Sequence, residues 1–479
     1  MNETKQIAQF VRATNYEDIP AGIVDEFKIF VLDTIAAGFI GSLQPWTKKL
    51  VGVVHGLGGN PEASVFNQDW KIDVSRAALI NGTAIGSFEV EPLTGTHASG
   101  TVLPPLLAVC ERDHLPAKRF LTALVLGAEI QGRMSRTAIG LESERGFHNP
   151  GTQGPFGAAL AIGKLYDYDE RTLVNSMGIA GSHACGLVEF AWEGNDTKRM
   201  HLGRAAQLGM ESAFLAQAGF TGPSTIIEGR FGFYNAFSMP GADLGKLTDD
   251  LGSTWGVQPP FHKSYPLHAT QQAVVHAIQE FKRDHPIDPA RLSRIAIKGR
   301  ETMMEGRHSV REPHTVMGGQ YSLPFTVAVA VMRDLSNPLN YDDAAISDPT
   351  IRAMAQQVEL IHSSDEPEVL IDLDGRSHTL ATGPFKGSPR NPFSWDDMRE
   401  KFDRYAGQVL DASQRADIVS IVADLENVTD MAKLAELVSA RSSYFPEGVP
   451  PGVPPGVDTD SASDRLSEGV PSGVLLGDR

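Results

Sequence analysis

Apolar residues recur every three or four positions through most of the first 250 residues, which is the period of an α-helix with one buried face. Small residues such as Gly82 and Gly86 lie on these apolar faces and let helix axes approach closely. The clearest helical segments are residues 23–35, 77–87, 103–112, 120–139, 156–165, 173–180 and 205–218. The pattern predicts a large all-helical domain over residues 1–264.

The pattern changes near residue 285. Residues 292–298 alternate between apolar and polar side chains as a strand does, and a β-hairpin is predicted around Asp374 and Gly375. Two helical segments, residues 321–334 and 348–358, precede this hairpin. The two strands of the hairpin are residues 369–373 and 378–381. We therefore expect a smaller α+β domain over residues 265–395, packed as a lid, in a fold that is mainly α.

The helical period returns at residues 395–406 and 412–438, which predicts that residues 396–444 go back to the first domain. Residues 445–479 carry Gly-Val-Pro repeats and no aromatic side chain. Such a composition buries too little apolar area to offset the entropy of ordering, so we expect a disordered tail.

Composition excludes several classes of function. The net charge of −17 argues against a nucleic-acid surface, which needs clustered basic residues. Two cysteines are too few for an iron–sulfur cluster, a disulfide framework or an all-cysteine zinc site. The apolar runs fall short of the roughly 20 residues of a membrane span, and the acidic N-terminal segment does not resemble a signal or a presequence. The expected location is cytoplasmic, with no membrane or nucleic-acid partner.

Four short segments concentrate His, Lys and acidic side chains beside Gly and Pro, a combination suited to binding a polycarboxylate and moving protons on it. Their chemistry-bearing residues are Glu89, Glu91 and His97; His148; Lys198 and His201; and Lys263 and His268. Each segment alone also fits a structural interpretation: surface acids with a capping histidine, a loop histidine, a lysine that reaches to solvent, or surface cations.

The expected local structure favours the functional interpretation. Glu89 or Glu91 and His97 lie in a loop between two helices, where a carboxylate and an imidazole can relay a proton. His148 precedes a helix N-terminus, where amide groups favour an anion. Lys198 falls in a first helical turn, where the helix dipole lowers the pKa of an ammonium group. His201 shares its face.

No metal or cofactor site is expected. The histidines do not form an HxxxH or HExxH pair, and the glycines at residues 229–232 lack a nucleotide-binding pattern. Cys185 is interpreted as a buried cysteine on a small-residue helix rather than a nucleophile.

In order and spacing these segments resemble the MmgE/PrpD family, which includes 2-methylcitrate dehydratase, cis-aconitate decarboxylase and iminodisuccinate epimerase. The resemblance covers about residues 3–440 and includes NGTAIGSFEVE, HASGTVLPPLLA, GFHNPGTQGPFGAALAIGKL, TKRMHLGRAAQLGMES, KSYPLHATQQAV and GSPRNPFSWDDMREKF. It implies a helical domain with an α+β lid, a homodimer, and catalysis without metal or organic cofactor.

The resemblance also implies roles for the site residues. The family's acid, histidine and lysine positions fall on Glu89, His97, His148, Lys198, Lys263 and His268. We expect His97 and His148 to act as the acid/base pair, with Glu89 orienting one imidazole. Lys198, Lys263 and His268 are expected to bind and neutralise carboxylates.

Two positions depart from the family pattern. Glu89 stands where the family has an aspartate, which leaves Glu91 as an alternative working acid. Phe325 stands where the family has a tyrosine. Tyr321 either supplies the hydroxyl lost at that position, or the hydroxyl is missing. The predicted function is a cofactor-independent lyase on a small di- or tricarboxylate, with a 2-methylcitrate-type dehydratase favoured. A cis-aconitate-type decarboxylase, an iminodisuccinate-type epimerase and a non-catalytic polycarboxylate-binding homologue are the alternatives.

Overall fold

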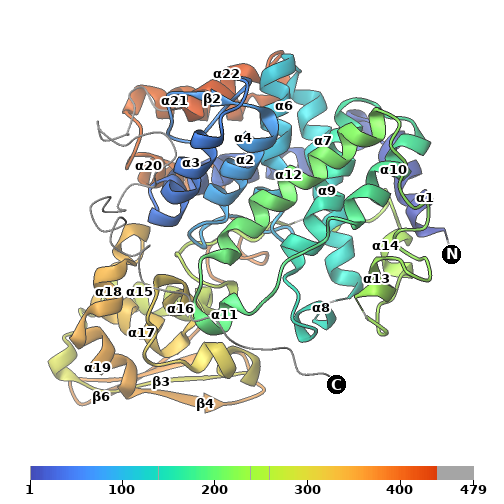
Figure 1. Cartoon of the computed structure of the whole chain (residues 1–479). Helices are drawn as coiled ribbons and strands as arrows, with labels where there is room; N and C mark the ends of the chain where they lie inside the picture. Colours follow the sequence, from blue (N-terminus) through green and yellow to red (C-terminus); the bar gives the residue numbers. More distant parts are fainter. Residues whose placement is uncertain (1, 139, 238, 258, 440–479) are drawn as a thin grey trace, which may run out of the picture.

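The computed structural model describes residues 2–138, 140–237, 239–257 and 259–439, and it has a mainly helical fold with one large helical part and a smaller α+β part (Figure 1). The expected tail at residues 445–479 lies outside the described residues. Within the described chain, no helix is both long and apolar enough to cross a membrane.

The helical domain is built on close crossings of helices that carry small residues. At one crossing, a Cβ added at Gly82 of α4 would lie 2.7 Å from the Cα of Gly203 on α12, so only glycine fits there. Each helical segment predicted within the first 250 residues corresponds to one helix. The long helices are α1 (Glu3–Ala13), α2 (Ala21–Ser42), α3 (Pro45–Leu57), α4 (Val74–Ile85), α6 (Leu103–Asp113), α7 (Ala117–Thr137), α9 (Asn149–Leu165), α10 (Glu170–Gly181) and α12 (Thr197–Gln217).

Short elements complete this domain. Strands β1 (Ala63–Ser64) and β2 (Lys71–Ile72) form a small antiparallel pair. The short helices are α5 (Ala98–Thr101), α8 (Leu141–Glu144), α11 (Phe190–Glu193), α13 (Phe233–Ala236) and α14 (Gly245–Thr248). Helices α5, α8 and α11 are the short helices most relevant to function, because they or the loops before them contribute residues to the cavity described below.

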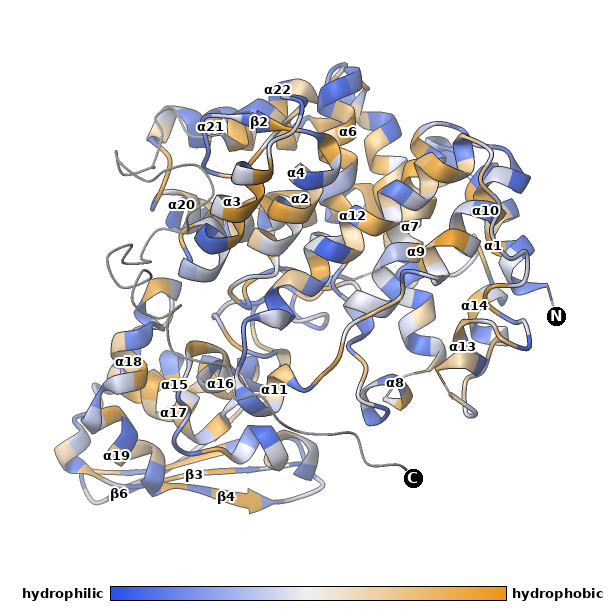
Figure 2. Cartoon of the chain, viewed as in Figure 1, coloured by the Kyte–Doolittle hydropathy of each residue, from blue (hydrophilic) through white to orange (hydrophobic). Residues whose placement is uncertain are grey.

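The lid contains a four-stranded sheet in the order β4-β3-β5-β6, at the lower left of Figure 1. The central strand β3 (Leu292–Gly299) is parallel to β4 (Val358–His362) and antiparallel to β5 (Glu368–Leu373), which continues through a tight turn into β6 (Arg376–Ala381). Asp374 and Gly375 both have positive φ, as a two-residue hairpin turn requires. Figure 2 shows β3 largely hydrophobic and the edge strand β6 largely hydrophilic.

Helices α15 (Gln272–Asp284) and α17 (Leu323–Met332) pack against the face of this sheet that is turned toward the helical domain (Figure 1). The other lid helices are α16 (Val316–Tyr321), α18 (Asp343–Ser347) and α19 (Pro349–Gln357). The predicted strand 292–298 and the hairpin are confirmed. The helix predicted to reach residue 358 is wrong at its end, because Val358 opens β4 and pairs with Ile295.

After the lid the chain returns to the helical domain through α20 (Trp395–Ala406), which packs on α2. Ser394 caps α20, and Ser394 and Asp397 form a capping box. The helical segment predicted over residues 412–438 consists of α21 (Ala412–Ala423), two 3-10 turns and α22 (Ala432–Ala435). This return brings Lys401 of α20 beside Asp33 of α2, a contact that supports the site described next.

Candidate active site

A cavity of about 230 Å³ lies where the helical domain meets the lid. It is smaller than the roughly 300–1,000 Å³ of drug-sized sites, which suits a small substrate. The titratable side chains in its wall come from both domains: Glu89, His97, Glu142, His148, Lys198, Lys263, His268, Arg307 and Tyr321. The structure therefore brings together all four segments that sequence analysis selected.

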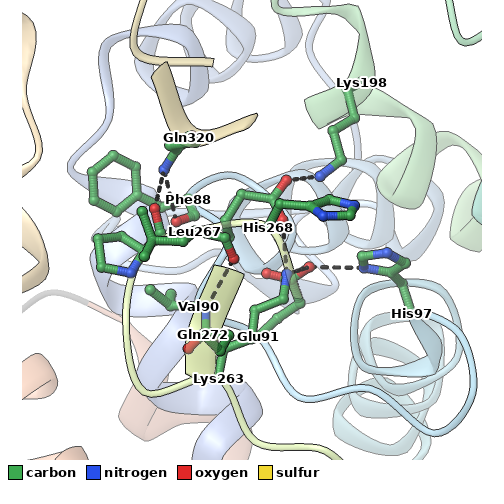
Figure 3. A network of polar contacts seen from close by, with 12 residues as sticks. Phe88, Val90, Glu91, His97, Lys198, Lys263, Leu267, His268, Gln272 and Gln320 are labelled. Carbon is green, nitrogen blue, oxygen red and sulfur yellow. Dashed lines mark hydrogen bonds and ion pairs between the residues drawn. The ribbon is translucent and has the colours of Figure 1, made fainter. Parts of the chain in front are cut away.

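The acidic pair lies in the loop that follows α4, and both side chains are buried. Glu89 has a φ of 59°, in the left-handed region that side chains other than glycine rarely adopt. Its two carboxylate oxygens contact different lysines: Oε1 contacts Lys198, and Oε2 lies 2.8 Å from Nζ of Lys263. Strained residues of this kind concentrate at functional sites. Here one carboxylate contacts both ammonium groups. Figure 3 shows the side chains of Lys198 and Lys263 extending toward the same region, beside Glu91 and His97.

The carboxylate that orients an imidazole is Glu91, so the prediction that Glu89 does so is wrong. Nδ1 of His97 lies 2.7 Å from Oε1 of Glu91. An ionised carboxylate only accepts hydrogen bonds, so Nδ1 carries the hydrogen and Nε2 remains available to exchange a proton. Burial alone would raise the pKa of Glu91, but Lys263 and the hydrogen bond from His97 outweigh it and lower the pKa to about 2.

A second pair of imidazoles lies near His97. His148 directly precedes α9, and its Nδ1 is 3.0 Å from Nδ1 of His201, which α12 supplies. The ring centroids of His97 and His148 are 6.2 Å apart. Burial, followed by repulsion from neighbouring cationic groups, holds the pKa of His148 well below 6.5, and burial lowers the pKa of His201 to about 4. Both rings are therefore neutral near pH 7, the form that accepts a proton.

Lys198 is the second residue of α12, as the sequence predicts, and its side chain is buried. Burial is the main cause that lowers its pKa, with further lowering by Lys263 and nearby arginines. The contact with Glu89 acts in the opposite direction, since a carboxylate stabilises the ammonium form. Burial and cationic neighbours thus favour release of a proton from Lys198, while Glu89 favours its ammonium form, so this group can bind a carboxylate or give up a proton.

The lid contributes His268 and Tyr321 to the cavity. Their rings lie 4.7 Å apart, and Nζ of Lys198 is 5.3 Å from the centroid of the Tyr321 ring. Phe325, the position at which the family has a tyrosine, is fully buried in the lid core and lies 6.3 Å from the ring of Tyr341. The aromatic hydroxyl of the cavity wall therefore belongs to Tyr321, which ends α16, four residues before the family position on α17.

Sequence analysis missed Arg307 and Glu142. Arg307 lies in the 3-10 turn Gly306–Ser309 of the lid, and Glu142 lies on α8; both line the cavity. Neither is part of a motif, and only the tertiary fold brings them to the other segments. Thr152 and Gln153 of α9 donate hydrogen bonds to Glu142. Burial raises the pKa of Glu142 to about 8, so this acid is protonated at neutral pH.

The raised pKa of Glu142 predicts a pH dependence of stability. Its folded-state pKa of about 8 exceeds the reference value of 4.5. The contribution of Glu142 to the free energy of unfolding is therefore fully present below pH 4.5 and is lost as pH rises through 8. We expect Tm to fall between pH 6 and pH 9 in the parent protein and to fall less in Glu142→Gln. Glu144→Gln, an exposed change on the same short helix, is the control and should follow the parent. Parallel decreases in all three proteins would contradict the assignment.

A buried ammonium group behind the cavity, that of Lys401, holds the backbone of two loops: the acid loop and the loop that carries Lys263. Lys401 donates to Oδ1 of Asp33 at 2.5 Å, to the carbonyl of Val90 at 3.1 Å and to the carbonyl of Lys263 at 2.6 Å. Asp33 also lies 2.7 Å from Nδ1 of His262. Val90 separates the two acidic residues, so Lys401 links the acid loop to the loop that carries Lys263.

Lys401→Met is expected to lower the free energy of unfolding by about 3 kcal/mol. That is the low end for removing one partner of a buried ion pair, because Asp33 keeps its contact with His262. Turnover should fall as well, since the acid loop loses a backbone anchor. Urea unfolding and steady-state rates measure the two effects. Arg399→Met, an exposed change on the same helix, is the control. Unchanged stability in Lys401→Met would show that the group is not a structural anchor.

Two features lie outside the cavity. Among the described residues, one group of His and acidic side chains is close enough to share a metal ion: Glu301, Glu305 and His362, exposed on the lid. Cys185 is exposed in the segment after α10, so the prediction of a buried helical cysteine is wrong. The helix ends at Gly181, and the following turns carry Cys185 to the surface.

Comparisons with known proteins match nearly the whole chain. Residues 5–243 match the MmgE/PrpD N-terminal domain, and residues 265–427 match the MmgE/PrpD C-terminal domain. Cis-aconitate decarboxylase of Mus musculus is 26% identical over 467 residues, which cover 92% of this chain and 94% of the mouse protein. The enzyme of Homo sapiens is 28% identical over 464 residues, with 92% and 95% covered. A cis-aconitate decarboxylase of Aspergillus terreus is 24% identical over 470 residues, with 91% and 96% covered.

Proposed function

The chain belongs to the MmgE/PrpD family, as its sequence motifs predict, and from this membership we propose that it is a decarboxylase of an unsaturated tricarboxylate of the cis-aconitate type. The observation that supports this choice most is the match to cis-aconitate decarboxylases over more than nine tenths of both chains. Sequence motifs alone favoured a dehydratase. The relatives, which are about 25% identical, support a lyase. Among lyase reactions they favour decarboxylation.

The side chains of the cavity suit this reaction. When the carbon–carbon bond to the leaving carboxylate breaks, CO₂ departs and its electron pair stays on the substrate carbon as a carbanion next to a carboxylate. Lys198 and Lys263 stabilise that negative charge, and their burial strengthens the interaction. A proton must then reach carbon. We assign this delivery to Nε2 of His97, because the contact of Nδ1 with Glu91 favours the positively charged imidazolium form.

A 2-methylcitrate-type dehydratase is the second candidate, and a specific observation favours it. Elimination of water needs a base for the C–H proton and an acid for the departing hydroxide. The cavity offers both near pH 7: His148 is neutral, and Glu142 is protonated. Decarboxylation uses an acid but no base. The presence of both His148 and Glu142 in the cavity wall therefore supports hydro-lyase chemistry as the second candidate.

Proton NMR of the enzyme in D₂O with cis-aconitate, 2-methylcitrate and iminodisuccinate separates the candidates. An itaconate-like product with deuterium on carbon supports the decarboxylase. Alkene formed from 2-methylcitrate supports the dehydratase, and exchange of the α-hydrogen without net reaction of iminodisuccinate supports an epimerase. Binding without turnover or exchange on all three substrates would contradict the proposal and leave a non-catalytic polycarboxylate binder.

A further inference from the structure

Arg307 is the lid cation that lines the cavity. It lies in the turn Gly306–Ser309 and is partly exposed, unlike the two buried lysines. Its guanidinium carbon is 5.0 Å from the centroid of the Tyr321 ring, and its Nε is 3.5 Å from Nε2 of His308. Contact with an aromatic ring restrains the plane of the guanidinium group and leaves its terminal N–H groups able to bind other partners.

The charge of Arg307 has no carboxylate partner within the described part of the chain. The other two cations of the cavity wall are already paired: Lys198 with Glu89, and Lys263 with both Glu89 and Glu91. Glu142 is the other acid in the wall, and it is held by Thr152 and Gln153. Of the three Lys and Arg side chains in the described cavity wall, Arg307 is therefore the one whose charge is available to bind an anion.

The field of this unpaired charge reaches the reacting groups. Arg307 is among the causes that lower the pKa of His148, Lys198 and His268, after burial and closer cationic neighbours. These three residues come from α9, α12 and the lid loop before α15. Arg307 and these three residues line the same cavity, so an anion bound to Arg307 shares that cavity with them.

We propose that Arg307 anchors a substrate carboxylate away from the reacting carbon, and so makes the enzyme select substrates with a carboxylate at the lid end of the cavity. This inference rests on the proposed function. A guanidinium offers two parallel N–H donors that match a carboxylate, a geometry that a lysine cannot reproduce. Because Arg307 belongs to the lid while His97, His148 and Lys198 belong to the helical domain, the bound substrate bridges the two domains.

The test is the affinity for tricarballylate, a saturated tricarboxylate, measured by titration calorimetry. Charge-assisted hydrogen bonds of this kind correspond to about 10–100-fold in affinity. We expect Arg307→Met to raise Kd by about that factor and Arg307→Lys to give an intermediate value, since lysine keeps the charge and loses the fork. Arg300→Met, an exposed lid arginine paired with Glu366, is the control and should leave Kd unchanged.

Kinetics with the substrate found by NMR add a second readout. An anchor that holds ground state and transition state alike predicts a higher KM with kcat within a few-fold of the parent value. A Kd in Arg307→Met within threefold of the parent value, or a fall in kcat with Kd unchanged, would overturn the inference. Calorimetry needs no turnover, so an enzyme inactive on every substrate would refute the proposed function while the Kd series still decides the role of Arg307. Arg307→Lys decides it if the methionine variant does not fold.

Discussion

His97→Gln is expected to lower kcat by about 10²–10⁴, the usual effect of removing a group that transfers a proton in the transition state. A glutamine amide still donates a hydrogen bond to Glu91, so the buried acid keeps a partner at this position. Glutamine has no counterpart of the imidazole Nε2, so the group that delivers the proton is lost. KM should change much less than kcat, because the lysines and Arg307 that hold the substrate remain.

The matched control for this change is His114→Gln. His114 also pairs through Nδ1 with a carboxylate, Asp430, at 2.9 Å, but its side chain is 70% exposed and is not part of the cavity wall. It should retain parent kcat. Steady-state kinetics on both variants, with circular dichroism to confirm folding, decide the question. A His97→Gln enzyme with kcat within threefold of the parent value would exclude His97 as the proton donor.

The helices and the hairpin could be predicted from sequence because their signals are local. Ser394 and Asp397 mark the start of α20, and Asp374 with Gly375 marks the β5–β6 turn. The strand β4 was missed for the opposite reason. Residues 349–357 form a helix, and only pairing with β3, some sixty residues earlier, makes Val358–His362 a strand. Tertiary contacts override the local pattern at that point.

The site shows the same division. Motif order selected the four segments that line the cavity, but the spacing of Glu89, Val90 and Glu91 carries no information on which acid faces which partner. In the structure Glu89, which has a left-handed backbone, contacts both lysines, while Glu91 contacts His97 and Lys263. Lys401 and Asp33 were invisible to sequence analysis, because 368 residues separate them.

The pairing of buried charges explains how an acidic chain holds an anionic substrate. Two carboxylates neutralise two lysines in a wall with almost no solvent exposure. Such a cluster folds at tolerable free energy because each charge has a partner. The ammonium groups are therefore in place before substrate binds, and they stabilise developing negative charge without reorganisation. The same pairing makes the cluster sensitive to the loss of one member.

Lys263→Met is expected to lower the free energy of unfolding by about 3–5 kcal/mol at pH 7, because it leaves Glu89 and Glu91 facing one remaining lysine. The loss should depend on pH. The pKa of Glu91 is about 2 in the folded protein against a reference of 4.5, so its stabilising contribution is present above pH 4.5 and is lost as pH falls toward 2. Lys263 is the largest cause of that lowering, ahead of His97.

Without Lys263, burial dominates and raises the pKa of Glu91, so this acid takes up a proton under mildly acidic conditions. The difference in stability between the parent and Lys263→Met is therefore largest at pH 7 and narrows from pH 4.5 downward, as urea unfolding at several pH values measures. Adding Glu89→Gln removes the surplus charge and should recover part of the loss. Lys246→Met, at an exposed lysine 4.0 Å from Asp243, should have little effect at any pH. A difference that stays constant with pH would assign the loss to side-chain packing rather than to the buried carboxylates.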